Sequence, residues 1–481
     1  MNELPAGWTW AELCQVCTSI TDGDHQAPPQ VSAGIPFLVI GNIRTRSLNF
    51  TNSRHVPREY FESLDPVRRP RKGDVLYSLV GSYGIPVLVR DDKPFCVQRH
   101  IGILRPSPQI SPAFLALVLS SRAVFDQATQ FATGTAQLTV PLAGLRRIRI
   151  PFPPRQEQER IVAVIEEQFS RLDAGVAVLE RMRRNLRRMR ASVLHAAVTG
   201  RLVPRIEDAA AAMRLVSQLC LEASTLGRRK TAVPATQYLD HVPNSWQVVA
   251  LADLAESIDY GTSEKTRADV RGVPILRMGN LGWGTINYND LKFLPREQLD
   301  PRLLLRRGDL LFNRTNSAEL VGKTAVFHGY PQDIAFASYL IRVRALPSTN
   351  LEWANIVLNS PIGRRYVAAV RNQQVGQANV NGTKLAAAPI PLPSSEEQSQ
   401  IIKECERLFS VIEMLEDATA AAVYRSDRLR SSVVSTAFAG ELVAQDSNDE
   451  PASELLKRIA AMHAASNGRQ SARQRSTTAT P

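Results

Sequence analysis

The stretch that decides the fold is a proline-rich step that reads Ile150-Pro151-Phe152-Pro153-Pro154-Arg155-Gln156-Glu157-Gln158. Prolines end the structure before them and are tolerated in the first turn of a helix, so this step predicts the start of a helix just beyond it. The step returns 240 positions later as Ile390-Pro391-Leu392-Pro393-Ser394-Ser395-Glu396-Glu397-Gln398. The sequence therefore carries this helix start twice.

Further matches at nearly the same offset surround the two steps. A tryptophan recurs as Trp8 and Trp246, and a charged turn recurs as Arg71-Lys72-Gly73-Asp74 and Arg306-Arg307-Gly308-Asp309. Collinear matches of this kind indicate a tandem duplication with a period far longer than that of a solenoid repeat. The other matched pairs are Ile35-Pro36-Phe37-Leu38 with Val273-Pro274-Ile275-Leu276, Gly41-Asn42 with Gly279-Asn280, Phe169-Ser170 with Phe409-Ser410, and Gly200 with Gly440.

Each step opens onto a segment with a heptad pattern of apolar residues, and the first segment has no proline from Gln156 to Thr199. A heptad pattern sustained this long predicts a coiled coil, and the duplicated seam predicts that the two helices pair antiparallel within one chain. The alternative is that each helix packs separately against its own globule. The predicted seam is Ile165, Leu172, Leu179, Leu186 and Val193 with Val162, Phe169, Val176, Met182 and Met189 in the first helix, and Ile401, Leu408, Leu415, Ala422 and Leu429 with Cys405 and Ile412 in the second.

The segments before the two steps have a different sequence pattern. Short apolar runs at 35–40, 75–80, 273–276 and 309–312 are broken by Gly, Pro and Asn, which is typical of strands and turns. One helix is predicted in each segment, over 111–131 and over 351–370. The fold class is therefore α+β, with two mixed α/β domains joined by two long helices in a pseudo-twofold tandem repeat.

The alternation of these two sequence patterns also predicts the order of the domains. Shorter helices are expected at 208–221 and 452–464, and the polar composition near the end favours disorder. The predicted order is a first globule over 1–150, a central helical region over 151–222, a linker over 223–241, a second globule over 242–389, a distal helical region over 390–464 and a disordered tail over 465–481.

Composition narrows the class of protein. With 44% hydrophobic and 22% charged residues, the chain is balanced like an ordinary globular protein. Its net charge of +12 favours a polyanion such as nucleic acid as partner, although a basic balance also occurs without one. The sequence has no apolar run long enough for a membrane span and no signal-peptide pattern at its start, so we expect a cytoplasmic protein without a membrane partner.

The sequence predicts no catalytic, cofactor-binding or metal-binding residues. Val321-Gly322-Lys323-Thr324 resembles the end of a phosphate-binding loop, but Ser317 stands where the first glycine would be needed. Asp91-Asp92-Lys93 and Asp290-Leu291-Lys292 resemble the end of a metal-nuclease motif, yet neither triplet has an equivalent in the other copy. Cys14 and Cys17 form a C-x-x-C without a second pair at zinc-ligand spacing.

Two groups of polar residues could meet nucleic acid. The first helix carries an arginine run whose face could be merely solvated, contact a phosphate backbone or contact an acidic protein surface. Residues of this run are Arg181, Arg183, Arg184, Arg187, Arg188 and Arg190. Arg can read guanine, and Asn or Gln can read adenine, although ordinary loop polarity is the alternative for any single residue. The globule candidates for DNA contact are Arg44, Arg46, Gln98, Arg99, His100 and Gln137 in the first copy, and Arg277, Asn280, Asn313, Arg314, Asn316 and Asn379 in the second.

Taken together, these residues resemble the specificity (S) subunit of Type I restriction–modification systems. The resemblance covers nearly the whole chain in the family's order, and its most specific motif is the proline-rich step followed by Glu-Gln and a hydrophobic helix. Other matching motifs are the helix exits Thr199-Gly200-Arg201-Leu202-Val203 and Ala439-Gly440-Glu441-Leu442-Val443 and the loop Gly134-Thr135-Ala136-Gln137. The second copy departs from the family at this loop with Gly376-Gln377-Ala378-Asn379, and Phe152 replaces the usual leucine.

The resemblance implies a DNA-reading subunit without chemistry of its own. Two target-recognition domains would each read half of a bipartite site in double-stranded DNA, and the conserved helices would set the spacer. Two methyltransferase (modification) subunits would dock on the helices and bring S-adenosylmethionine, and two restriction subunits could add ATP- and magnesium-dependent translocation and cleavage. The residues expected in the coiled coil and in partner contacts are Glu157, Gln158, Phe169, Leu172, Leu179, Leu186, Glu397, Gln398, Leu408, Phe409, Leu415 and Leu429.

Two other classes of protein are alternatives. An endonuclease with a fused specificity domain would need a further catalytic segment, whereas the domains above already account for the whole sequence. A purely structural coiled-coil protein would not need two similar α/β globules.

Overall fold

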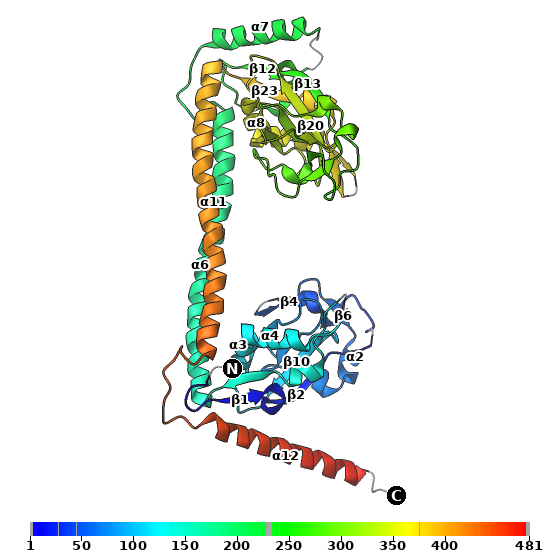
Figure 1. Ribbon diagram of the computed structural model, residues 1–481, viewed down its shortest axis with the longest axis vertical. Helices are drawn as coiled ribbons and strands as arrows, with labels where there is room; N and C mark the ends of the chain where they lie inside the picture. Colours follow the sequence, from blue (N-terminus) through cyan, green and yellow to red (C-terminus); the bar gives the residue numbers. More distant parts are fainter. Residues whose placement is uncertain are drawn as a thin grey trace. The chain divides into compact units, whose positions relative to one another are not determined.

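The computed structural model describes residues 3–26, 28–44, 46–135, 137–227, 233–239, 241–374 and 376–477. The chain divides into two compact units, of which unit 1 holds residues 1–179 and 421–481 and unit 2 holds residues 180–420. Each unit contains one globule and one section of each long helix, α6 (Arg155–Val198) and α11 (Ser395–Phe438) (Figure 1).

The globule of unit 1 is built on a four-stranded antiparallel sheet and a three-stranded sheet. In sheet order the first contains β2 (Cys17–Asp22), β10 (Ile101–Pro106), β7 (Val75–Ser78) and β8 (Pro86–Leu88), and the second contains β6 (Arg54–Val56), β3 (Ile35–Leu38) and β9 (Cys96–Val97). Two strand pairs join β1 (Thr9–Glu12) to β11 (Arg149–Phe152) and β4 (Ile43–Arg44) to β5 (Ser47–Leu48). The helices of this globule are α1 (Leu13–Val16), α2 (Arg58–Ser63), α3 (Pro112–Leu119), α4 (Arg122–Phe131) and α5 (Leu142–Arg146).

The globule of unit 2 repeats this topology and adds one sheet. Its four-stranded sheet contains β13 (Ala255–Tyr260), β20 (Leu340–Ala345), β16 (Leu310–Asn313) and β18 (Thr324–Val326), and its counterpart to the second sheet contains β15 (Lys292–Leu294), β14 (Val273–Leu276) and β19 (Ala335–Phe336). The pair β12 (Gln247–Ala250) with β23 (Pro389–Leu392) matches β1 with β11, and the added sheet contains β17 (Thr315–Asn316), β22 (Gln377–Asn379) and β21 (Asn372–Gln374). The helices of unit 2 are α7 (Ala209–Thr225), α8 (Leu351–Asn359), α9 (Pro361–Val370) and α10 (Gly382–Ala386).

The central strand of each globule is buried on both faces, which explains its continuous apolar run. In β7, Val75 and Tyr77 share a core with Phe114 of α3, whereas Leu76 shares a core with Leu38 of the second sheet. Strand β16 divides its residues between two cores in the same way. The matching strand order and burial confirm the predicted duplication and the α+β fold class.

The repeated charged turn is structural. Asp74 is buried, and its carboxylate accepts two hydrogen bonds from Arg105 of β10 at 2.9 and 2.8 Å. Asp309 receives the same pair of bonds from Arg344 of β20 at 3.0 and 2.8 Å. A bidentate pair of this kind satisfies the buried carboxylate, so both copies keep the aspartate regardless of what each globule binds.

Both predicted globule helices are broken in two. The first is interrupted because the Ser121 hydroxyl accepts a hydrogen bond from the backbone N–H of Val124 and caps a new helix, α4. The second is interrupted at Pro361, which occupies the first turn of α9 after the cap residue Ser360. Single helices over 111–131 and 351–370 were therefore wrong, because the serine caps were read as helix interior.

The two long helices run antiparallel. In unit 1, Arg430 of α11 donates a 2.6 Å hydrogen bond to Asp173 of α6 and lies over the Phe169 ring. In unit 2, Arg190 of α6 donates a 3.2 Å hydrogen bond to Glu413 of α11. The first half of α6 therefore meets the second half of α11 in unit 1, and the reverse holds in unit 2, as the pairing predicted from the heptads requires.

The buried face of α11 differs from the predicted seam in its second half. Leu429 is 54% exposed, whereas Thr419 and Ser426 are buried and continue the seven-residue spacing of Cys405 and Ile412. Thr419 can be buried because its hydroxyl donates to the Leu415 carbonyl within the helix. The sequence pattern favoured the larger apolar side chain, but the partner helix determines which face is covered.

The seam of α6 follows the prediction more closely. Leu186 and Val193 are buried, whereas Met182 and Met189, predicted to enter the seam, are 41% and 44% exposed. The line of residues seven apart from Ile165 to Val193 therefore forms the contact face, and the methionines lie outside it.

Two shorter helices extend from the helical regions. In unit 2, Leu215 and Leu219 of α7 share a core with Leu254, and Asp208 caps the helix as the sequence indicates. In unit 1, α12 (Ala452–Thr477) begins as expected but stays helical beyond residue 464, which differs from the predicted tail. Ala, Arg and Gln are good helix formers, and residues 478–481 lie outside the described residues.

Candidate nucleic-acid interface

Three chain segments meet at the exit of each central strand. In unit 1 the backbone N–H of Leu79 donates to the His100 carbonyl at 2.9 Å, and the N–H of Val140 donates to the Leu79 carbonyl at 2.8 Å. We call this place the loop edge. It comprises residues 79–82, 98–100, 133–135 and 137–139 in unit 1, and residues 314–316, 337–339, 372–374 and 376–379 in unit 2.

The loop edge of unit 2 is held by equivalent backbone bonds. The Arg314 N–H donates to the Tyr339 carbonyl at 3.0 Å, and the Val380 N–H donates to the Arg314 carbonyl at 2.9 Å. The scaffold is therefore the same in both copies, whereas the side chains it presents differ.

The loop edge of unit 1 brings together four of the predicted residues. The exposed Arg99 and the adjacent His100 are joined by a contact of 3.3 Å between Nε and Nε2, and Gln98 precedes them. Burial and the Arg99 charge lower the pKa of His100, so the imidazole is neutral near pH 7 and can accept a hydrogen bond. The exposed Gln137 lies against Gly81, where a Cβ would stand 3.3 Å from its Nε2. Ala136 of this loop lies outside the described residues.

The loop edge of unit 2 gathers three predicted residues: Asn316 and Asn379 on the small sheet β17-β22-β21, and Arg314 just before it. Arg314 donates to Asn379 Oδ1 at 3.3 Å, and Asn379 Nδ2 donates to Thr315 Oγ1 at 2.7 Å. Asn316 is half-buried, and its Oδ1 accepts the N–H of Ser317 at 2.8 Å. These contacts fix the planes of the guanidinium and amide groups, as reading a base edge requires.

Two exposed tyrosines were missed by the sequence analysis, Tyr339 within this edge and Tyr260 beside it. The Arg314 guanidinium lies 4.8 Å from the centre of the Tyr260 ring, and Tyr339 follows Ser338 at the same edge. Tyr339 occupies the place of His100 in the repeat, so the offset between copies was the signal that could have revealed it.

Five other candidates lie outside the loop edges or are committed to the fold. Asn280 is buried, and its amide bonds the Arg277 N–H at 2.9 Å and the carbonyls of Asn287 and Asn289 at 2.9 and 3.0 Å. Arg277 in turn donates to the Asp290 carbonyl at 2.9 Å. This geometry contradicts a base-reading role for Asn280, which holds a turn.

Asn313 is also an internal residue. It is fully buried at the end of β16, and its Nδ2 donates to the Met278 carbonyl at 3.4 Å. Its position contradicts direct contact with DNA. Arg44 is exposed on β4 but does not belong to the loop edge.

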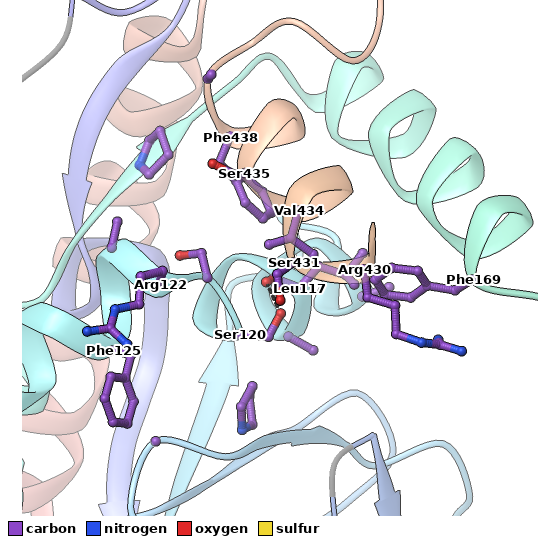
Figure 2. A pocket seen from close by; sticks show the side chains of 18 of the residues that line it. Leu117, Ser120, Arg122, Phe125, Phe169, Arg430, Ser431, Val434, Ser435 and Phe438 are labelled. Atoms are coloured by element: carbon purple, nitrogen blue, oxygen red, sulfur yellow. Dashed lines mark hydrogen bonds between the residues drawn. The ribbon is translucent and has the colours of Figure 1, made fainter. Parts of the chain in front are cut away.

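Arg46 is exposed but packs against the long helices. Its guanidinium lies 4.4 Å from the centre of the Phe169 ring and 3.6 Å from Asp173, in the lining of a groove of about 1150 Å³ within unit 1. Figure 2 shows that Phe169, Arg430 and Val434 of the long helices line this groove opposite Leu117 of α3. The packing of Arg46 onto α6 ties the globule to its helix and places this residue outside the loop edge.

Four residues predicted for partner contact are buried. The indole N–H of Trp8 donates to Glu157 at 2.9 Å, and Gln158 donates to the Pro153 carbonyl at 3.1 Å. Glu397 and Gln398 make the matching bonds in unit 2, with Trp246 at 3.0 Å and with the Pro393 carbonyl at 3.0 Å. Burial contradicts a role in partner contact, and these residues instead lock each globule onto its helix.

The outer surface of the helices in unit 2 is both apolar and basic. Met182 and Met189 of α6 and Val411 and Met414 of α11 are exposed apolar side chains. Five residues of the arginine run are exposed, and the sixth, Arg190, is half-buried over the Phe409 ring.

The remaining predicted helix residues are half-buried. They are Leu172, Leu179, Leu408, Phe409 and Leu415. No helix in the described part of the chain has the length and apolar character for a membrane span.

The chain contains two α/β globules that share one scaffold and differ in their loop edges. Each globule is fixed to an antiparallel pair of helices, and this arrangement defines a duplicated recognition protein. The family model of the Type I restriction modification DNA specificity domain matches residues 26–176 and 243–422. The chain belongs to this family.

Two specificity subunits are similar to this chain over nearly its whole length. The chain is 25% identical to the Type I restriction enzyme EcoKI specificity subunit of Escherichia coli K12, covering 99% of each chain. It is 24% identical to the StySPI specificity subunit of Salmonella potsdam over 98% of this chain and 99% of that one. A chain of a type I R-M system solved to explain its complex assembly and conformational transition has 21% identity and a TM-score of 0.59, covering 92% of this chain and 100% of that chain, which supports the fold.

Proposed function

We propose that this chain is the DNA-reading subunit of a Type I restriction–modification complex and that its two globules read the two halves of a bipartite target. The observation that carries the proposal is the pair of loop edges, which share their backbone bonds but present different side chains. Arg99 and His100 in unit 1 are replaced by Ser338 and Tyr339 in unit 2. Side chains of different hydrogen-bonding pattern select different bases, so the half-sites differ.

The long helices are the proposed docking surface for two modification subunits. Exposed apolar side chains on a helix pair, such as Met189 and Met414, are typical of surfaces that bind further helices. Two restriction subunits could join the same complex. The methyl donor S-adenosylmethionine, ATP and magnesium would belong to these partners, and the chain alone would neither methylate nor cut DNA. The names of the similar proteins give no support to a fused endonuclease.

Selection from a randomised duplex library by the assembled complex tests the proposal. The expected result is one bipartite motif with a fixed spacer. Replacing residues 240–389 with the equivalent globule of a related protein should change one half-site and preserve the other. If both half-sites change, or if the complex selects no motif, the globules are not independent readers.

A further inference from the structure

The turn that resembles a phosphate-binding loop has another structure. Val321-Gly322-Lys323-Thr324 leads into the strand β18, whereas a phosphate-binding loop leads into a helix. Its backbone donors are already used, since the Val321 N–H bonds the Ser317 carbonyl at 3.0 Å and the Gly322 N–H bonds the Asn313 carbonyl at 2.8 Å. The turn therefore offers no cradle of N–H groups to a nucleotide.

The same turn places a lysine in a cationic cluster. The Lys323 ammonium lies 5.8 Å from the centre of the Trp283 ring, and the Arg364 guanidinium lies 4.2 Å from the same centre. Arg364 donates to the Glu319 carbonyl at 3.1 Å, and Arg371 donates to the Ala318 carbonyl at 2.6 Å. The arginines thus hold the turn, while Trp283 supports both cations.

The positive charge of this cluster is not balanced by acidic side chains. Within the described ranges, no carboxylate lies within ion-pair distance of Lys323, Arg364 or Arg371, and no side-chain hydrogen bond of Lys323 is found. Burial and the Arg364 charge lower the pKa of Lys323, and burial with the Arg371 charge lowers the pKa of Arg364 to about 10. Repulsion of this kind is relieved when an anion binds.

The cluster adjoins the loop edge of unit 2. The Gly322 N–H bonds Asn313, the residue before Arg314, and Arg371 stands directly before the first residue of β21. A duplex whose bases face the amides of β22 would therefore bring its backbone near this turn.

We infer that Lys323, supported by Trp283 and Arg364, binds a phosphodiester of the DNA backbone beside the half-site read by unit 2. This inference rests on the proposed function. It assigns the phosphate contact and the base contacts to different residues of the site. Phosphate contacts fix the register of a protein on DNA without reading sequence, whereas contacts to base edges select it. Lys323 therefore positions the duplex, and the residues of the loop edge discriminate between bases.

The salt dependence of DNA binding by the assembled complex tests the inference. Loss of one phosphate contact lowers the slope of log K against log salt concentration by about 0.9. We expect Lys323→Gln to lower the slope by this amount, with equal loss of affinity for target and non-target duplexes. Lys323→Arg should restore the slope, because it keeps the charge.

Arg307→Gln is the matched control. Arg307 is exposed at the turn before β16, at the opposite end of that strand from the loop edge, so its loss removes the same charge without changing the slope. Thermal unfolding of each variant confirms that the fold is retained. An unchanged slope in Lys323→Gln, or an altered base preference, would overturn the inference even while the wild-type complex selects its motif. Absence of sequence-selective binding by the wild type would overturn the proposed function itself.

Discussion

The indole N–H of Trp8 donates a 2.9 Å hydrogen bond to the buried carboxylate of Glu157, which lies in the first turn of α6. Trp246 and Glu397 form the same bond at 3.0 Å in the second copy. Each pair joins residues about 150 positions apart in the chain and closes a globule onto its own helix. The bond therefore fixes where a reading module ends and the helical region begins.

Trp8→Phe should destabilise unit 1 by about 1–3 kcal/mol, because it leaves the buried Glu157 carboxylate without its donor. Trp10→Phe is the matched control, since the Trp10 ring stacks under Arg149 and is half-buried. Urea unfolding followed by circular dichroism measures both variants. Equal losses for the two would show that the Trp8 bond contributes nothing beyond packing.

Stability should also depend on pH through Glu157, whose pKa is raised above its usual 4.5 by burial. The folded state then binds the proton more tightly than the unfolded state, so this contribution is fully present below pH 4.5 and is lost as pH rises through the raised pKa. Glu157→Gln removes the titration. The free energy of unfolding of the variant relative to wild type should therefore increase from pH 4 toward neutrality, and a constant difference would contradict the expectation.

The duplication and both helix starts could be predicted because they rest on local signals, prolines and heptads, that occur twice. The second half of the α11 seam could not be predicted. Thr419 and Ser426 replace apolar residues there, and only the position of α6 shows that Leu429 points outward.

Two substitutions, one on each long helix, compare a buried heptad position with the exposed Leu429. Leu186→Ala should cost about 2–5 kcal/mol, because it opens a cavity in the buried contact face. Leu429→Ala should change stability by no more than about 0.5 kcal/mol, because the side chain is exposed. Urea unfolding measures both. Comparable losses would show that Leu429 belongs to the seam after all.

The loop edges were only partly predictable. Arg314 and Asn379 were chosen for their chemistry, but Tyr260 lies on a distant strand and its place at the edge follows from tertiary structure. Asn280 is the opposite case, because it was chosen as a DNA-contact residue but is buried in a turn. Asn42 stands at the same position in the first copy and makes the same bond. A residue shared by two globules whose loop edges differ is better explained by a common turn than by base reading.

Asn280→Ala should therefore reduce stability by about 1–3 kcal/mol and leave the target sequence unchanged, because it removes three internal hydrogen bonds. Asn316→Ala at the loop edge should do the reverse, with little loss of stability and a changed preference in one half-site. Library selection and urea unfolding on the same two variants separate these roles. A changed motif in Asn280→Ala would restore it as a reading residue.

Gln137 and Gln377 provide the most direct comparison of the two modules. They stand at equivalent places in the repeat, 240 positions apart, and both side chains are exposed at their loop edges. A bidentate amide contact to adenine discriminates by about 1–3 kcal/mol, so removing it should relax the preference at one base pair. Gln137→Ala should relax only the half-site of unit 1, and Gln377→Ala only that of unit 2, with the spacer unchanged in both. Selection from a randomised duplex library by each assembled variant measures this. If either substitution altered both half-sites, the two globules would not read DNA independently, and if neither altered any, the loop edges would not be the reading surfaces.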